Sequence, residues 1–355
     1  MAKKRIEWID IAKYVGIILV MVSHLESDTE VLATFYRPFY LTLFFFTSGY
    51  VYNARDNFKT FFYKKFRQLF VPWLIFSVFI ILLSQVLSFN EQGRLLTELK
   101  WNFLQIRGIG DEIWFVAALF VAFIPFYFLI DWSNKAPSAI KGGSKVSIAI
   151  VISFVLSLVS IVYTKLMNPE LLPWNSVALP WHLEYIFQAM FFMVLGYFFK
   201  TKGEVIFDKY NTTRNRIICW GIYLVLIYMP FATGFGLPGY IDVIYQYVCQ
   251  LTGIAAVVSV CKIIKTNKYI SYVGQNTLIY FALHGKVYSL GQTILKKFAG
   301  EIYSMILSNV VISSLFAILF SLVLSVVLII PAYVINRWFP AIVGRKKVHK
   351  ERRTP

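Results

Sequence analysis

Ten long apolar stretches run through this chain, and they restrict it to a membrane fold. The predicted spans are residues 8–25, 36–53, 69–89, 111–131, 146–165, 181–199, 216–232, 241–261, 270–289 and 306–336. In lipid, backbone polar groups must be paired within the protein, so only helices and closed barrels cross a bilayer. Barrel strands alternate at a period of two, whereas these runs are continuously apolar. We therefore expect an all-α, polytopic bundle of about ten transmembrane helices.

The composition agrees with this fold class. Hydrophobic residues make up 58% of the chain, aromatic residues 18%, and the mean hydropathy is +0.64. Such values are typical of polytopic membrane proteins. We find no linker long enough to separate domains, so we expect one membrane domain over residues 1–340 and a basic tail over residues 341–355.

Positive charge is distributed unevenly between the loops. The net charge is +17, and one alternating set of loops, with both termini and Lys13, holds 27 of the 35 lysine and arginine residues. Cytoplasmic loops carry such an excess. The prediction is a multi-pass protein of the cell membrane with both termini in the cytoplasm. A nucleic-acid partner is not expected, because the charge is spread over short loops rather than one folded face; the bilayer is the expected partner.

A lysine and a histidine lie on one face of the first span. Lys13 and His24 are eleven residues apart, which in an α-helix is about 20° more than three full turns and a rise of ~16 Å. Asp10 shares this stripe and can pair with Lys13. Ionisable residues inside a span are costly and usually functional. The spacing suits a substrate that lies along the helix, with a charged group at one end and its reacting atoms at the other.

Other unusual polar residues gather at two levels of the predicted topology. The outer level holds His24, Asp111, Glu112, Trp114, His182, Glu184 and His284; the inner level holds Asp10, Lys13, Lys64, Lys65 and Arg67. Structural interpretations stay open for many of them. The histidines and tryptophans can be interfacial anchors, and the basic residues can simply mark cytoplasmic loops.

No metal site is expected. The chain has three cysteines without metal-ligand spacing and no hydrolase, zinc or nucleotide-loop motif.

Five segments, in order along the chain, carry a family resemblance. They are Arg5-Ile6-Glu7-Trp8-Ile9-Asp10-Ile11-Ala12-Lys13 with His24, Phe45-Phe46-Thr47-Ser48-Gly49-Tyr50, Lys64-Lys65-Phe66-Arg67-Gln68-Leu69-Phe70-Val71-Pro72-Trp73, Ile113-Trp114-Phe115-Val116, and Gly274-Gln275-Asn276-Thr277-Leu278-Ile279-Tyr280 with His284. Together they resemble the acyltransferase family 3 membrane proteins, in particular the fucose 4-O-acetylase-like branch. Many members have arginine where this chain has Lys13, which keeps the charge but loses the paired donors of a guanidinium.

The resemblance implies transfer of an acyl group, commonly acetyl, from cytoplasmic acetyl-CoA to a hydroxyl of an extracytoplasmic or lipid-linked saccharide. On this hypothesis the catalytic residues are His24, Glu184 and His284, with His24 as general base. The residues expected to bind the acetyl-CoA phosphates are Lys13, Lys64, Lys65 and Arg67. The residues expected to contact substrate are Asp10, Trp114 and His182.

Two other kinds of protein stay open at this point. A transporter or flippase would move a polar or lipid-linked molecule without chemistry, and an assembly or sensing subunit would need neither His24 nor Glu184. The sequence leaves open which sugar hydroxyl is acylated, which short acyl group is used and the oligomeric state.

Overall fold

A computed structural model describes residues 5–87, 95–110, 113–135, 142–234, 236 and 238–345, and these residues are helical almost throughout. Within them the only β pairing is an isolated bridge between Ile106 and Ile109. The α-helices are α1 (Glu7–Val22), α2 (Glu30–Tyr36), α3 (Tyr40–Tyr50), α4 (Phe58–Lys65), α5 (Val71–Leu87), α6 (Leu95–Leu104), α7 (Trp114–Lys135), α8 (Gly142–Leu166), α9 (Ile186–Phe198), α10 (Glu204–Tyr210), α11 (Thr213–Thr233), α12 (Gly239–Cys261), α13 (Lys268–Gln275), α14 (Thr277–Ser308), α15 (Val310–Val327) and α16 (Ile329–Trp338). Short 3₁₀ or π segments are η1 (Phe66–Phe70), η2 (Pro169–Leu171), η3 (Pro180–His182), η4 (Phe199–Gly203) and η5 (Pro340–Val343).

The protein is a polytopic helical membrane protein, as predicted. Seven helical stretches in the described residues are long and apolar enough to cross a membrane: Phe58–Val86, Trp114–Lys135, Lys145–Leu166, Pro180–Tyr210, Thr213–Thr233, Ile241–Cys261 and Val310–Trp338. The three other expected spans correspond to α1, α3 and the α13–α14 segment. Helices α1 and α3 have only 16 and 11 residues, so they do not reach the length of a full span.

Side-chain caps fix where several helices begin. Thr29, Asn57, Thr212 and Asn267 each accept a hydrogen bond from the backbone N–H three residues later, at the starts of α2, α4, α11 and α13. Asn309 accepts from two backbone N–H groups at the start of α15. These caps satisfy donors that a helix leaves unpaired at its first turn.

Two expected spans are broken by local sequence. The stretch 36–53 is broken at Pro38, between α2 and α3, because proline has no backbone N–H to continue the helical hydrogen bonds. The stretch 270–289 divides at Asn276 into α13 and α14. The break at Asn276 lies in the interior of the bundle, where the buried Asn276 side chain donates to the carbonyl oxygen of Tyr272.

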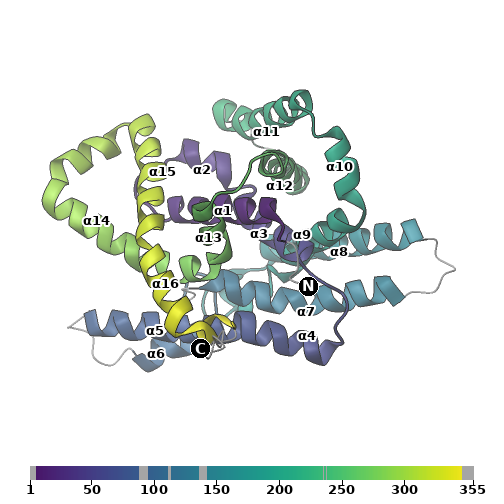
Figure 1. Cartoon of the computed structure of the whole chain (residues 1–355), viewed down its shortest axis with the longest axis horizontal. Coiled ribbons are helices and arrows are strands. Elements are labelled where there is room, and N and C mark those ends of the chain that lie inside the picture. The colour runs from purple at the N-terminus through teal and green to yellow at the C-terminus, as the bar shows by residue number, and fades with distance from the viewer. Residues whose placement is uncertain are drawn as a thin grey trace, which may run out of the picture.

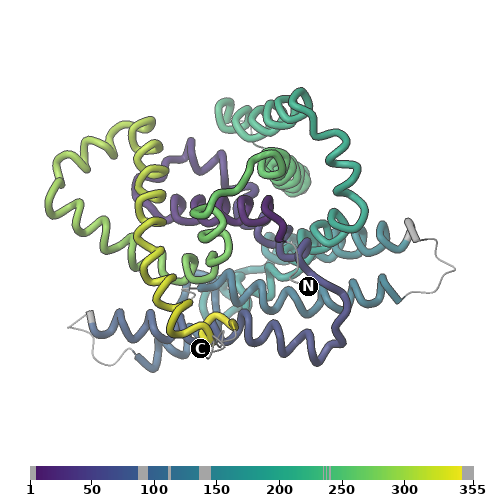
Figure 2. The backbone as a smooth tube through the Cα atoms, viewed as in Figure 1, coloured from purple at the N-terminus to yellow at the C-terminus, as the bar shows by residue number. Residues whose placement is uncertain are grey.

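The first helix lies at the centre of the molecule. Helix α1 contacts α3, α12, α13, α14 and α15, and Figure 2 shows this purple segment running through the middle of the bundle. Long helices α4, α5, α7 and α8 lie lengthwise on one side, α11 and α12 lie on another, and α14 with α15 forms an arm (Figure 1). Helix α1 is therefore surrounded by other helices, while His24, just beyond its end, is exposed.

Helices α3 and α9 pack through glycines. A Cβ added at Gly49 would lie 1.8 Å from the carbonyl oxygen of Met193, and one added at Gly196 would lie 1.9 Å from that of Phe46. Only glycine allows backbones to approach so closely.

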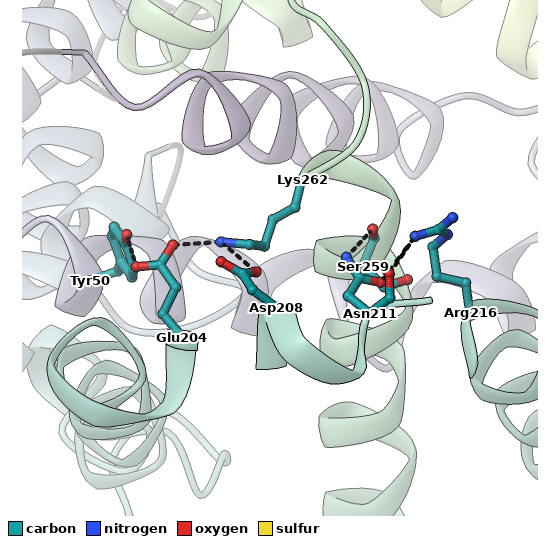
Figure 3. A network of polar contacts seen from close by, with 7 residues as sticks. All are labelled: Tyr50, Glu204, Asp208, Asn211, Arg216, Ser259 and Lys262. Carbon is teal, nitrogen blue, oxygen red and sulfur yellow. Dashed lines mark hydrogen bonds and ion pairs between the residues drawn. The ribbon is translucent and has the colours of Figure 1, made fainter. Parts of the chain in front are cut away.

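A polar network joins α3, α10 and α12 (Figure 3). Lys262, at the end of α12, is bonded to Glu204 and lies 3.1 Å from Asp208, while the Tyr50 hydroxyl donates to Glu204 at 2.6 Å. Nearby, Asn211 donates to the carbonyl oxygen of Ser259 at 3.0 Å. The side chain of Lys262 is only 9% exposed, and two carboxylates compensate its buried charge.

Candidate active site

Two histidines from different helices lie in contact. His24 follows the last turn of α1, and His284 lies on α14; their ring centroids are 4.8 Å apart. The His24 side chain is exposed, whereas His284 is buried. The two imidazole rings are in an edge-to-face contact, with an angle of 60° between their planes. We call this end of α1 the histidine end, and the end that carries Lys13 the basic end.

The backbone sets the tautomer of His284. Its Nδ1 lies 2.8 Å from the carbonyl oxygen of Phe281. A carbonyl oxygen only accepts, so Nδ1 carries the proton and Nε2 carries the lone pair. Within the described part of the chain Nε2 is buried and has no hydrogen-bond partner. A neutral His284 is therefore an acceptor and donates from Nε2 only when its ring is doubly protonated.

The loop after His24 is held by a buried carboxyl group. The Tyr36 hydroxyl donates to Asp28 Oδ2 at 2.5 Å. Burial raises the pKa of Asp28 above its usual value, although the Tyr36 hydrogen bond acts in the opposite direction. The contact connects α2 to the turn that follows His24.

A second polar cluster surrounds His182. This histidine is fully buried, and its Nδ1 lies 3.8 Å from Glu184 Oε1. Its ring centroid is 5.3 Å from that of Trp114, and the Arg107 guanidinium carbon lies 5.5 Å from the centroid of the Trp114 ring. Glu184 accepts the backbone N–H of Leu179 at 2.8 Å. The histidine that Glu184 faces is therefore His182, not His24 or His284.

The backbone at this cluster is strained. Trp181 and His182 have φ values of 58° and 55°, in the left-handed region that costs non-glycine residues about 1–3 kcal/mol each. Both His182 nitrogens and Glu184 Oε1 have no hydrogen-bond partner within the described residues. Strain and unpaired buried polar atoms occur together here, which is a common feature of functional sites.

A cavity of about 200 Å³ lies between α1, α3, α7, α14 and the α4–α5 segment. Lys13 and Lys65 line it, and Lys65 Nζ lies 3.7 Å from the centroid of the Phe123 ring. The rest of the lining is mainly apolar, with Ile17, Phe44, Phe115 and Phe281 among its members. Two cations therefore belong to a largely apolar cavity inside the bundle.

A larger, polar cavity of about 670 Å³ adjoins it at the basic end. It shares Lys13 and Val51 with the first cavity and adds Arg5, Asp10, Lys200 and Arg345. Asp10 accepts a hydrogen bond from Arg5, where the spacing had indicated a pair with Lys13. We call this space the basic vestibule; it concentrates positive charge at the mouth of the apolar cavity.

The structure brings together only part of the predicted site. His24 and His284 meet, Trp114, His182 and Glu184 form the second cluster, and Asp10, Lys13 and Lys65 line the two cavities.

Lys64 instead pairs with Asp56 at 2.8 Å on the surface, and the Arg67 guanidinium lies 5.8 Å from the Tyr63 ring. Neither Lys64 nor Arg67 lines either cavity. Asp111 and Glu112 lie outside the described residues.

Sequence reasoning missed four cationic residues. Arg5, Lys200 and Arg345 line the basic vestibule, and Arg107 contacts Trp114. The uneven loop charge included the first three, but it gave no way to choose them among the other basic residues.

In the described part of the chain no group of three or more histidine, cysteine or carboxylate side chains could hold a metal ion.

A family comparison covers nearly the whole chain. The model of acyltransferase family 3, described as an acyltransferase domain, matches residues 6–333. No curated protein and no solved structure gives a significant match. The matched range includes α1 to α15 and thus both histidines, the second cluster and most of the cavity lining.

Proposed function

The chain belongs to acyltransferase family 3, and on this premise we propose that it is a membrane O-acyltransferase. It moves an acetyl or other short acyl group from cytoplasmic acyl-CoA to a hydroxyl of an extracytoplasmic or lipid-linked saccharide. The observation that carries this proposal is the order of groups along α1: the basic vestibule, the apolar cavity and then the histidine pair.

The basic vestibule suits the phosphates of acetyl-CoA. Arg5, Lys13, Lys200 and Arg345 are cations around one space of about 670 Å³, and clustered cations attract phosphate groups strongly. The vestibule lies at the end of α1 whose loops carry the excess of positive charge, so we place this end in the cytoplasm. The pantetheine arm then extends through the apolar cavity, past Lys65 and Ile17.

The two histidines supply acid–base catalysis. The ring centroid of His24 lies 4.8 Å from that of the buried His284, which positions it, and the neutral imidazole of His24 accepts a proton. It removes the proton of the sugar hydroxyl as the oxygen attacks the thioester carbonyl carbon. A C–O bond forms, the C–S bond breaks, and His24 returns the proton to the departing CoA thiolate. Positioned acid–base groups of this kind contribute about 10²–10⁴-fold in rate.

The second cluster suits the acceptor. Trp114 offers an aromatic face, and His182 and Glu184 offer hydrogen-bonding atoms that have no protein partner within the described residues. Unpaired buried polar atoms favour a ligand that hydrogen-bonds to them. We therefore assign the sugar to this side of the histidine pair, and Glu184 acts on it through His182.

The test uses purified protein in lipid nanodiscs with acetyl-CoA and a candidate glycan. We expect glycan-dependent release of free thiol together with a gain of one acetyl mass on the glycan. His24→Ala is expected to lower the rate by about 10²-fold or more while the variant still inserts and still binds acetyl-CoA. A wild-type protein that binds glycan but consumes no acetyl-CoA would instead support a transporter.

A further inference from the structure

Three phenylalanine rings stand at the end of the apolar cavity that faces the histidine pair. Phe44, Phe115 and Phe281 line the cavity, whereas neither His24 nor His284 does. The ring centroids of Phe44 and Phe115 are 5.6 Å apart, those of Phe115 and Phe281 are 5.4 Å apart, and that of Phe281 is 5.7 Å from the His284 ring. All three phenylalanines are buried. We call these three rings the aromatic plug.

Two of the rings are held from several sides. A Cβ added at Gly16 of α1 would lie 2.7 Å from the Phe44 ring, so this ring packs directly on the α1 backbone. Phe115 also contacts the rings of Phe45 and Trp114. The ring contacts of Phe281 within the described residues are with Phe115 and His284. Of the three rings, Phe281 is therefore the one that both lines the cavity and contacts His284.

We propose that the aromatic plug separates the donor cavity from the histidine pair in the resting protein, and that rotation of the Phe281 ring admits the acyl thioester. This inference rests on the proposed function. A lasting opening would join the cytoplasmic cavity to the exposed His24, and water entering it would hydrolyse the thioester. A plug that moves only for the donor prevents this loss.

The plug also sets the size of the acyl group. An acetyl group requires only the displacement of one ring, whereas a longer chain must also displace Phe44, which packs on the α1 backbone, or Phe115, which packs on Phe45 and Trp114. Close-packed interiors resist such overpacking at a cost of about 1–3 kcal/mol. Phe281 is therefore a specificity-determining residue that favours the shortest acyl donors.

Thiol labelling tests the separation without any reliance on catalysis. The three native cysteines (Cys219, Cys249 and Cys261) are replaced by alanine, and Ser48→Cys places one thiol in the cavity. Ser48 lies one helical turn beyond Phe44 on α3 and lines the cavity on the basic side of the plug. A charged, membrane-impermeant thiol reagent is then applied from either face of oriented vesicles.

We expect labelling of this thiol from the face of the basic loops and at least roughly 10-fold slower labelling from the other face, a ratio equivalent to about 1.4 kcal/mol. Phe281→Ala is expected to make the two rates similar.

The matched control is Phe120→Ala, which removes an equally buried ring of α7 that packs on Phe66 and Phe70 and does not line the cavity. Phe281→Leu serves the same purpose if the alanine variant does not accumulate in the membrane. Equal labelling from both faces without a plug substitution, or unchanged sidedness in the Phe281 variants, would overturn the proposal.

A second measurement compares acetyl-, propionyl- and butyryl-CoA as donors. Phe281→Ala should raise the butyryl-to-acetyl ratio of kcat/KM by roughly 10-fold or more, since one methylene is worth about 10–200-fold in a fitted apolar site. If the wild type transfers acetyl and this ratio does not change, the plug does not set acyl size. If the wild type transfers no acyl group, the proposed function fails, while the labelling result still decides whether the plug exists.

Discussion

At the scale of single residues, the structure distinguishes side chains that look equivalent in sequence. Lys64 and Lys65 are adjacent, and both lie in a loop where positive charge is expected. In a helix, consecutive residues point about 100° apart, so Lys65 reaches the cavity beside Phe123 while Lys64 pairs with Asp56 on the surface. The same holds for His284, whose role depends on the carbonyl oxygen that its Nδ1 meets.

The two lysines give a direct test of donor binding. We expect Lys65→Glu to raise the KM for acetyl-CoA by about 10-fold or more, because it replaces a charged hydrogen-bond donor worth about 1.5–3 kcal/mol with a like charge. Lys64→Glu should change this KM by less than about 2-fold, because an exposed ion pair contributes about 0–1 kcal/mol. The measurement is initial-rate kinetics with varied acetyl-CoA at saturating glycan.

The glycan KM is the internal control for both variants, and it should not move. A larger effect from Lys64 than from Lys65 would contradict the placement of the donor in the cavity.

At the scale of elements, close backbone packing of the central helices α1 and α3 against their neighbours forms the site. Helix α3 approaches α9 through Gly49 and Gly196, and this contact positions Phe44 in the cavity wall. Helix α1 approaches α13 in the same way, since a Cβ at Gly274 would lie 2.3 Å from the carbonyl oxygen of Asp10. These contacts fix the relative positions of the helices that line the cavity, because a glycine has no side chain that could change conformation to allow another arrangement.

Gly196→Ala should destabilise the α3–α9 contact. Its added methyl group would meet the carbonyl oxygen of Phe46, and overpacking of this kind costs about 1–3 kcal/mol. Gly221→Ala in α11 is the matched control, because nothing lies within 4 Å of the added atom and alanine is the better helix former. We expect a lower midpoint of thermal unfolding in detergent for Gly196→Ala only; equal midpoints for the two variants would count against the packing described here.

At the scale of the whole molecule, long outer helices enclose a short central one. A helix of 16 residues such as α1 is about 24 Å long, less than the ~30 Å hydrocarbon thickness. The basic vestibule and the exposed His24 lie near its two ends. The distance that donor and acceptor must cover to meet is therefore shorter than the membrane is thick.

This arrangement predicts which face each end of α1 occupies. In the cysteine-free background, a single cysteine at Lys59 in α4 should react with an impermeant reagent only from the cytoplasmic face. A cysteine at Leu171, an exposed residue of η2, should react only from outside. Both positions on one face would remove the physical basis for a donor and an acceptor that arrive from opposite sides.

The sequence by itself determined the fold class and the family, and it predicted the stripe from Lys13 to His24. These features depend on local composition and helical spacing, which a linear chain displays directly. The tertiary structure alone decided that His24 meets His284, that Glu184 faces His182, that Lys65 rather than Lys64 lines the cavity, and that Arg5, Lys200 and Arg345 surround its mouth. Each of these depends on which faces of distant helices pack together, and glycine contacts and helix breaks fix that packing in ways that hydropathy and charge do not encode.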